Sequence, residues 1–424
     1  MSEGVDTVGM DTPPRLAVDR LLDDRETRII VCCGAGGVGK TTTAAALGVR
    51  AAGRGRKAVV LTIDPARRLA QSMGIDSLDN TPRKVETVGA GDGELHAMML
   101  DMKRTFDEIV EAHADGERAR AILANPFYQS LSAGFAGTQE YMAMEKLGQL
   151  RARDDWDLII VDTPPSRSAL DFLDAPKRLG SFLDGKFIRV LMAPAKVGGR
   201  AGMKFLNVGM SMMTGTLSKL MGASLLKDVQ TFVAAMDTMF GGFRTRADAT
   251  FRLLQAPGTA FLVVAAPEAD ALREAAYFVE RLAAERMPLA GLVLNRVHGS
   301  GAAQLSAERA SAAAENLEEG GIVDQESGKA GLRDSGAEPT EPTEPSEPTE
   351  GDTAVVDRIT AGLLRLHAER MQVIAREQRT RDRFTSLHPE VAVAEVAALP
   401  GDVHDLAGLR AIGERLAAGV PAGA

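Results

Sequence analysis

The sequence predicts an α/β fold, in which a doubly wound, mostly parallel sheet is flanked by helices. Short β-branched or apolar runs alternate with longer helical patterns, which is typical of parallel strands joined by helical crossovers. No Asn-Gly or Asp-Gly hairpin turn joins any two of these runs, and this favours a doubly wound arrangement over an antiparallel one. A glycine-rich segment follows the first run and leads into a helical pattern, as expected at the ligand crevice of such a sheet.

Seven runs have the length and composition of buried parallel strands. They are Arg28 to Cys33, Ala58 to Ile63, Glu94 to Leu100, Asp157 to Val161, Ala260 to Ala265, Gly291 to Leu294 and Val391 to Ala398.

The strand signal disappears between Leu173 and about Leu254, where the apolar residues follow a helical period. This predicts an inserted helical, Met-rich subdomain over residues 174–254. Residues 192–239 hold 8 of the 18 methionines of the chain. Such a stripe is either ordinary core or a groove that accepts varied apolar helices, and both interpretations stay open.

Two segments lack the residues that a core needs. Residues 1–15 are expected to form a flexible N-terminus, and residues 299–352 a disordered acidic insertion with 13 Asp or Glu against 3 Lys or Arg. The insertion contains a Glu-Pro-Thr repeat from Glu338 to Glu350, which is either a solubilising loop or a partner-binding arm. Residues 16–418 otherwise form the predicted α/β domain.

Composition excludes several classes of protein. The chain of 424 residues is 45% hydrophobic, has only 4% aromatic residues and carries a net charge of −9, so we expect no nucleic-acid partner. Cys32 and Cys33 are the only cysteines, and neighbours cannot form an ordinary disulfide or a structural zinc site. No uncharged run reaches the length of a membrane span. We therefore expect a cytoplasmic protein with no integral membrane segment.

A phosphate-binding loop follows the first predicted strand. Gly34-Ala35-Gly36-Gly37-Val38-Gly39-Lys40-Thr41 matches the eight-residue P-loop pattern, and Thr42 continues into a helix. Glycines allow the backbone N–H groups to turn inward, and the helix N-terminus adds a positive dipole end. We expect Lys40 to reach the β and γ phosphates of ATP or ADP, and Thr41 to bind Mg²⁺.

Two aspartates follow apolar runs, at the strand ends where the ligand crevice of such a sheet opens. Asp162 follows residues 158–161 and is placed to support the Mg²⁺ water shell. Asp64 follows residues 59–63 and can position or deprotonate an attacking water. Either aspartate alone can instead be a helix cap or a turn residue.

Together these motifs resemble the family of arsenical-pump ATPases and tail-anchored-protein targeting ATPases, within the deviant Walker A class. The resemblance rests on residues 36–42, Asp64-Pro65-Ala66 and Asp162-Thr163-Pro164-Pro165, and extends over most of residues 27–418. Ser132 to Glu140 and Leu399 to Val403 are similar to the segment after the third strand and to the adenine-side loop of that family.

The resemblance implies a nucleotide-gated dimer that closes around ATP. It implies phosphate and nucleotide contacts from Gly36, Gly37, Val38, Gly39, Lys40, Thr41 and Thr42, catalysis by Asp64 with Lys40, and metal support by Thr41 and Asp162. It also places Asn295, Pro267 and Glu268 near the adenine, although a lone Asn after a strand is equally typical of a turn.

The sequence also departs from the family pattern, at one position of the P-loop and in its cysteines. The class carries an extra P-loop lysine that reaches the partner's nucleotide, and Ala35 stands at that position. A homodimer should therefore hydrolyse ATP slowly or use another cation such as Arg67 or Arg68, and pairing with a lysine-bearing paralogue is an alternative. The cysteines of the arsenical pump and a Cys-x-x-Cys after Asn295 are absent, so neither metalloid transport nor an interfacial zinc is expected.

Three functions follow. The first is a dimeric ATPase whose nucleotide state opens and closes a hydrophobic helical surface for an apolar client. The second is a weakly catalytic regulatory subunit of a heterodimer. The third is a membrane-surface positioning ATPase, but residues 406–416 form only a weak, mixed-charge amphipathic helix that suits packing as the last helix.

Overall fold

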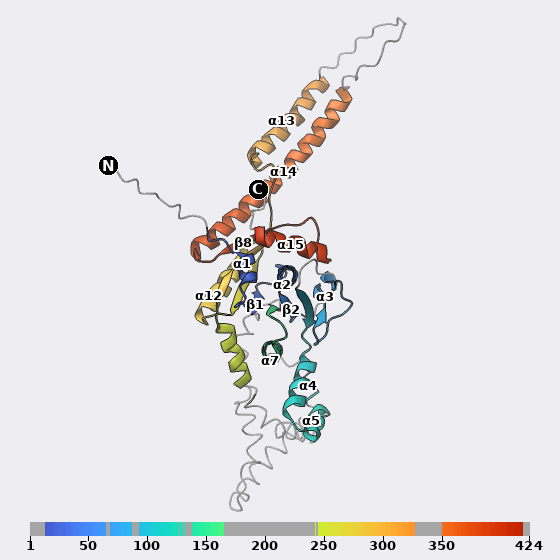
Figure 1. Ribbon diagram of the computed structural model, residues 1–424. Helices are drawn as coiled ribbons and strands as arrows, with labels where there is room; N and C mark the ends of the chain where they lie inside the picture. Colours follow the sequence, from blue (N-terminus) through green and yellow to red (C-terminus); the bar gives the residue numbers. More distant parts are fainter. Residues whose placement is uncertain are drawn as a thin grey trace, which may run out of the picture.

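The computed structural model describes residues 13–64, 68–86, 93–126, 128–129, 132, 138–164, 242, 245–326 and 350–418. Eight strands form one sheet in the order β3-β4-β2-β5-β1-β6-β7-β8, and all neighbours run parallel except β3 and β4 (Figure 1). The strands are β1 (Ile29–Cys33), β2 (Lys57–Thr62), β3 (Arg83–Lys84), β4 (Glu94–Met99), β5 (Leu158–Asp162), β6 (Thr259–Ala265), β7 (Leu289–Val297) and β8 (Val393–Ala397). The doubly wound, mostly parallel fold is confirmed, and the seven predicted strands are present to within three residues at each end.

Strand β3 was not predicted. It has only two residues, both exposed, so it lacks the apolar run that marks a buried strand. It pairs antiparallel with β4 at the edge of the sheet. Nine residues separate it from β4, so no two-residue turn marks this hairpin in the sequence.

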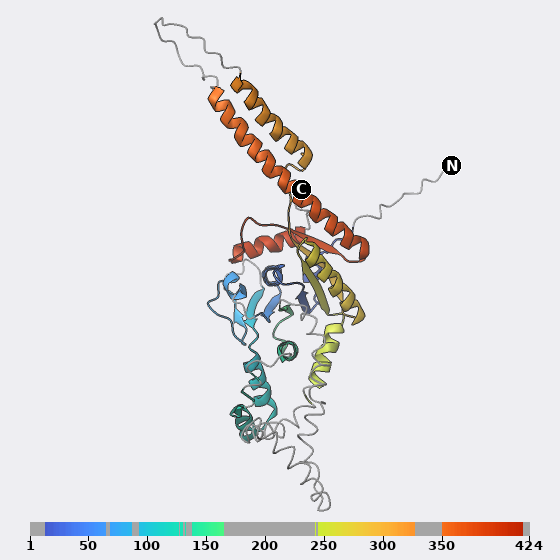
Figure 2. The same ribbon diagram turned by 180° about the vertical axis from the view of Figure 1, so that it is seen from behind.

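Helices cover both faces of the sheet (Figures 1 and 2). Side chains of α1, α2, α3 and α15 join one core, and those of α4, α5, α7, α12 and the end of α14 join the other. The helices are α1 (Val18–Asp23), α2 (Lys40–Gly53), α3 (Arg68–Ser72), α4 (Met102–His113), α5 (Gly116–Leu123), α7 (Thr138–Arg153), α12 (Ala269–Ala284), α13 (Ala307–Glu326), α14 (Glu350–Leu387) and α15 (Leu406–Ala418).

Alternation along β1 shows how the strands feed both cores. Ile30 and Cys32 belong to the core under α2, whereas Val31 and Cys33 belong to the core under α7 and α12. Burial raises the pKa of the Cys33 thiol to about 12. Both cysteines are therefore unreactive core residues, as the sequence indicated.

Helix α4 shows why these segments are helical. The carboxylate of Asp101 caps its N-terminus by accepting a hydrogen bond from the backbone N–H of Arg104 at 2.8 Å. Phe106, Ile109 and Val110 recur at helical spacing and are buried against the sheet. The same spacing packs the predicted last helix, α15, onto α2 through Leu409, Ile412 and Leu416.

The acidic insertion differs from expectation at both ends. Residues 307–326 form α13, and α14 already begins at Glu350, so the expected disorder does not hold there. Alanines explain the difference, because Ala310, Ala314 and Ala361 are fully buried and let the two helices approach closely. The Glu-Pro-Thr repeat from Glu338 lies outside the described residues up to residue 349.

The N-terminus differs as well. The carbonyl of Pro14 accepts a hydrogen bond from the backbone N–H of Val393 at 2.8 Å, and Arg15 forms a parallel bridge to the same residue. The last residues of the segment expected to be flexible are thus attached to the edge strand β8.

Most of the expected Met-rich subdomain, including its methionines, lies outside the described residues; its last turns are described, where residues 245–255 are helical. Within the part of the chain that the structure describes, no helix combines the length and the apolar character needed to cross a membrane.

Candidate functional site

The P-loop connects the end of β1 to the start of α2. A side chain at Gly34 would collide with the carbonyl of Val264. Gly39, the N-cap residue of α2, has φ 96°, and a side chain there would collide with the amide of Asn295. These two glycines are required by backbone geometry, and the loop delivers the N-terminus of α2, with its unpaired N–H groups, to the ligand crevice.

Asn295 in β7 holds this loop. Its Nδ2 donates a hydrogen bond to the carbonyl of Val38 at 2.9 Å, and its side chain is buried. The sequence analysis expected an adenine contact or a turn. The structure places Asn295 inside a strand, where its amide supports the P-loop and also lines the neighbouring cavity.

Lys40 folds back across the loop. Its Nζ donates to the carbonyl of Ala35 at 2.7 Å, and the residue is buried. Burial lowers the pKa of Lys40, while the nearby carboxylates, first Asp162, act in the opposite direction. An ammonium held this way is costly to bury without further anionic partners.

Asp162 ends β5 and is fully buried beneath the loop. Its Oδ2 accepts hydrogen bonds from Thr41 Oγ1 at 2.7 Å and from Thr62 Oγ1 at 2.8 Å. Its Oδ1 is buried without a hydrogen-bond partner among the described residues. Burial raises the pKa of Asp162 to about 6, against the two threonine hydrogen bonds that lower it.

This donor set fits Mg²⁺. The ion prefers oxygen ligands, keeps several waters and is held in P-loop proteins by a hydroxyl and a nearby carboxylate. Thr41 offers the hydroxyl, and the orphaned Oδ1 of Asp162 offers an acceptor for a metal-bound water.

Asp64 and Lys40 line one cavity beside the P-loop. This cavity of about 540 Å³ is lined by Lys40, Thr41, Asp64 and Arg68, with Thr163 opposite at the end of β5. The backbone N–H of Asp64 donates to Thr62 Oγ1 at 3.2 Å, so one threonine contacts both aspartate segments. Arg67 lies outside the described residues.

A second cavity of about 420 Å³ adjoins the first and shares Gly39 and Thr42 with it. The loop from Leu399 to Val403 contributes to its lining, as does Asn295. Pro267 and Glu268 instead lie at the start of α12 and line neither cavity.

Thr62, Arg296 and His298 are among the residues at this site that were not predicted from the sequence. Thr62 binds Asp162, and its signal was a hydroxyl at the end of an otherwise apolar run. Arg296 lines both cavities and lies at a β-bulge, where its φ is 62°. No pattern in the sequence predicts this bulge. His298 lines the second cavity and pairs with Glu377 of α14 at 2.6 Å.

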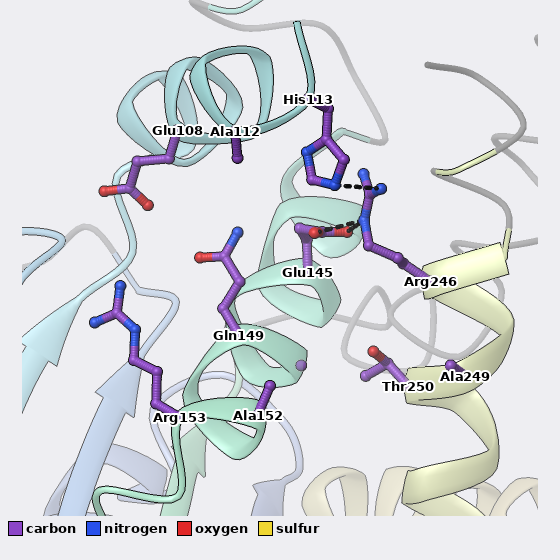
Figure 3. A pocket seen from close by; sticks show the side chains of 11 residues that line it. Glu108, Ala112, His113, Glu145, Gln149, Ala152, Arg153, Arg246, Ala249 and Thr250 are labelled. Atoms are coloured by element: carbon purple, nitrogen blue, oxygen red, sulfur yellow. Dashed lines mark hydrogen bonds and ion pairs between the residues drawn. The ribbon is translucent and has the colours of Figure 1, made fainter. Parts of the chain in front are cut away.

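A third cavity, of about 510 Å³, lies between α4, α7 and the helix at 245–255 (Figure 3). The carboxylate of Glu145 accepts two hydrogen bonds from Nε of Arg246, at 2.8 and 3.1 Å, and Nη1 of Arg246 lies 3.1 Å from His113 Nε2. The Nδ1 of His113 faces the carbonyl of Ile109 at 3.0 Å and must carry the proton, so Nε2 is the acceptor.

This cavity shares no lining residue with the other two, but α7 connects them. At the N-terminal end of α7, Gln139 Nε2 donates to the carbonyl of Ile63, directly before Asp64, at 2.9 Å. Further along the same helix, Glu145 and Gln149 line the third cavity.

Comparison with known proteins identifies related ATPases. The ATPase GET3 of Podospora anserina is 26% identical over 296 residues, which cover 68% of this chain and 80% of that protein. The ATPase GET3 of Malassezia globosa is 31% identical over 173 residues, or 41% of this chain, and the match spans about half (49%) of that protein. The ATPase BagA of Mycobacterium tuberculosis is 27% identical over 168 residues, which cover 37% of this chain and 48% of that protein.

The family model for anion-transporting ATPases matches residues 27–317, which include the P-loop, both aspartates and Asn295. With this match over more than half of its length, the chain belongs to the anion-transporting ATPase family.

Proposed function

We propose that the chain binds ATP with Mg²⁺ and hydrolyses it to ADP and phosphate. One observation carries the proposal: Thr41 Oγ1 lies 2.7 Å from a fully buried carboxylate, Asp162, whose second oxygen has no hydrogen-bond partner among the described residues. A buried carboxylate of this kind is unfavourable on its own and is stabilised when a hydrated cation occupies the cavity.

Each residue then has a role that its position supports. Lys40 exchanges the carbonyl of Ala35 for phosphate oxygens, because an ammonium binds an anion more strongly than a neutral carbonyl. Thr41 and Asp162 hold Mg²⁺, which neutralises the phosphate charge when bound. Asp64, in the same cavity, orients the attacking water and accepts its proton.

The second cavity suits the nucleoside. It adjoins the phosphate cavity at Gly39 and Thr42 and is lined by Asn295 and the loop from Leu399. We assign the adenine to this cavity and leave Pro267 and Glu268 out of the adenine site, since neither lines it.

The proposal extends to a dimer and a client. Two relatives are named ATPase GET3, and the sequence features that resemble the tail-anchored-protein targeting ATPases favour a nucleotide-gated dimer that opens and closes a hydrophobic helical surface. We place that surface on the Met-rich subdomain, outside the described residues.

A second function has one observation in its favour. Ala35 stands where the class carries the lysine that acts on the partner's nucleotide, and its carbonyl is engaged by Lys40. A charge supplied from the partner can accelerate phosphoryl transfer by roughly 10³-fold or more. The chain is therefore a candidate for the weakly catalytic subunit of a heterodimer with a lysine-bearing paralogue.

Phosphate release by the purified chain tests both functions. We expect Mg²⁺-dependent turnover that is lost in Lys40→Ala and Asp64→Asn, with ATP binding lost only in the first. Lys57→Ala is the matched control, because this lysine is exposed on β2 and its side chain forms an ion pair only with Glu94 among the described residues. Binding without turnover in the parent chain would favour the heterodimer subunit, and no ATP binding would refute both functions.

A further inference from the structure

The hairpin of α13 and α14 projects away from the sheet domain, at the end opposite to α4 and α5 (Figures 1 and 2). Only the C-terminal part of α14 reaches the domain core, through Phe384. The rest of α14 packs against α13 alone among the described helices, and one of its faces has no neighbour among the residues that the structure describes.

That face is apolar. Val356, Ile359, Leu363 and Leu366 are 59%, 59%, 61% and 63% exposed, and we call these four residues the α14 seam. Val373 continues the same row one heptad after Leu366 and is 38% exposed. The exposed large hydrophobic side chains of the described chain gather mainly on this one helix.

The seam lies opposite to α13. Ala361 and Ala368 are buried in the contact between the two helices. A position two residues from a buried alanine is rotated by about 160° around the helix, and Ile359, Leu363 and Leu366 all stand at that offset. The hairpin therefore has one closed seam, filled by alanines, and one open seam, lined by larger side chains.

Spacing identifies the kind of partner. The seam residues are separated by three, four and three residues, which is the a/d pattern of a coiled coil and presents a narrow row to another helix. A surface that binds lipid or a broad core would carry a wider apolar face.

Charge identifies the partner as a second copy of the same helix. By sequence, residues 350–357 of α14 hold three acidic residues and no Lys or Arg, whereas residues 358–383 hold seven arginines against three acidic residues. Residues 315–326 of α13, which lie beside the start of α14, hold five acidic residues and no Lys or Arg. One end of the hairpin is thus acidic and the other end of α14 is basic.

We propose that two copies of this chain associate through the α14 seam, with the two helices antiparallel. A two-fold axis near residue 361 places Val356 of one copy opposite Leu366 of the other, and Ile359 opposite Leu363. Each a position then meets a d position, and residues 350–357 of one helix, with three acidic residues, lie beside residues 365–372 of the other, which hold Arg365 and Arg370 against Glu369. A parallel pair would bring acidic ends together, which is unfavourable.

The base of the hairpin also contacts the nucleotide site. Glu377 pairs with His298, which lines the second cavity, and Arg370 donates to the carbonyl of Gly299 at 2.7 Å. Association through the seam itself needs no nucleotide, so it goes beyond the proposed ATPase cycle and is tested independently of it.

The first test is the mass of the full chain in nucleotide-free solution by light scattering. We expect a dimer in the parent chain and in Lys40→Ala, and at least a tenfold weaker dimer in Leu363→Glu. Leu387→Glu is the matched control, because Leu387 is 67% exposed at the end of the same helix, and the two-fold axis near residue 361 places no part of the partner's α14 opposite it. Since both leucines are exposed, both variants should keep the circular dichroism spectrum of the folded parent chain.

The second test reads the orientation. The only native cysteines are buried in β1, so Val356→Cys and Leu366→Cys each introduce one accessible thiol. An equal mixture of the two variants should form the mixed disulfide on mild oxidation, and neither variant alone should cross-link. A monomeric parent chain, a dimer that Leu363→Glu leaves intact, or same-site cross-links would each overturn the proposal.

Discussion

Burial of the Asp162 carboxylate predicts that the free energy of unfolding depends on pH. Burial raises its pKa to about 6 from an ordinary value of 3.8, so the folded chain binds this proton more tightly than the unfolded chain. The stabilisation that the folded chain gains from binding this proton more tightly is complete below pH ~4 and is lost as the pH rises through 6. At about 1.4 kcal/mol per pKa unit, the ionised group lowers the free energy of unfolding by about 3 kcal/mol at pH 8 and by about 1.6 kcal/mol at pH 5.

Asp162→Asn removes this titration and keeps an oxygen that can accept from Thr41 and Thr62. Its new NH₂ group occupies the site of the unpaired Oδ1, which costs about 1–3 kcal/mol at every pH. The difference in unfolding free energy between variant and parent should therefore shift by about 1.4 kcal/mol in favour of the variant between pH 5 and pH 8.

Urea unfolding without nucleotide or Mg²⁺, followed by circular dichroism at pH 5, 6, 7 and 8, measures this shift. Asp76→Asn is the matched control, because Asp76 is exposed and the variant makes the same chemical change away from the buried site. If the difference between Asp162→Asn and the parent were constant over this range, the carboxylate would already be ionised at pH 5 in the folded chain, and burial would not raise its pKa.

Three further predictions concern the loop and its support. Gly39→Ala should weaken ATP binding at least tenfold and lower the unfolding free energy by about 1–3 kcal/mol, because φ is 96° and the new methyl group meets the side chain of Asn295. Gly53→Ala is the control, since the space around Gly53 is open, and calorimetry measures binding and unfolding in both variants. Ala35→Lys should raise the rate of phosphate release at least ~10-fold if the missing charge limits turnover, and an unchanged rate would contradict that explanation. Arg56→Ala should lower the unfolding free energy by about 3–5 kcal/mol, since its buried guanidinium binds Asp157 and the carbonyls of Leu22, Asp24 and Thr27; Arg56→Lys should lose less, and urea unfolding decides.

Hydrophobic periodicity and turn-forming residues predicted most of the fold from the sequence. The central strands β1, β2, β5 and β6 are buried on both faces, so each is a nearly continuous apolar run that stands out against the helices. Strand β3 has no such run, and α13 reads as disordered because its apolar content is mainly alanine, whose close packing against α14 depends on a partner that local sequence does not reveal.

Sequence motifs likewise predicted the residues at the centre of the site. Lys40, Thr41, Asp64 and Asp162 were predicted from a loop pattern and from strand ends, and the structure brings them to one cavity or directly beneath it. Asn295 was predicted for a different contact, because only the three-dimensional path of β7 beside the loop shows that its amide reaches Val38. Arg296 and His298 depend on a bulge and on α14, which lie far away in sequence.

Equilibrium binding of ATP to the purified chain, measured by calorimetry with and without Mg²⁺, tests the central claim most directly. We expect one ATP per chain, tighter binding with Mg²⁺ than without it, loss of binding in Lys40→Ala and loss of the Mg²⁺ effect in Thr41→Ala. Binding that survives Lys40→Ala, or that ignores Mg²⁺ in the parent chain, would contradict the assignment of this loop and of Asp162 to a magnesium nucleotide.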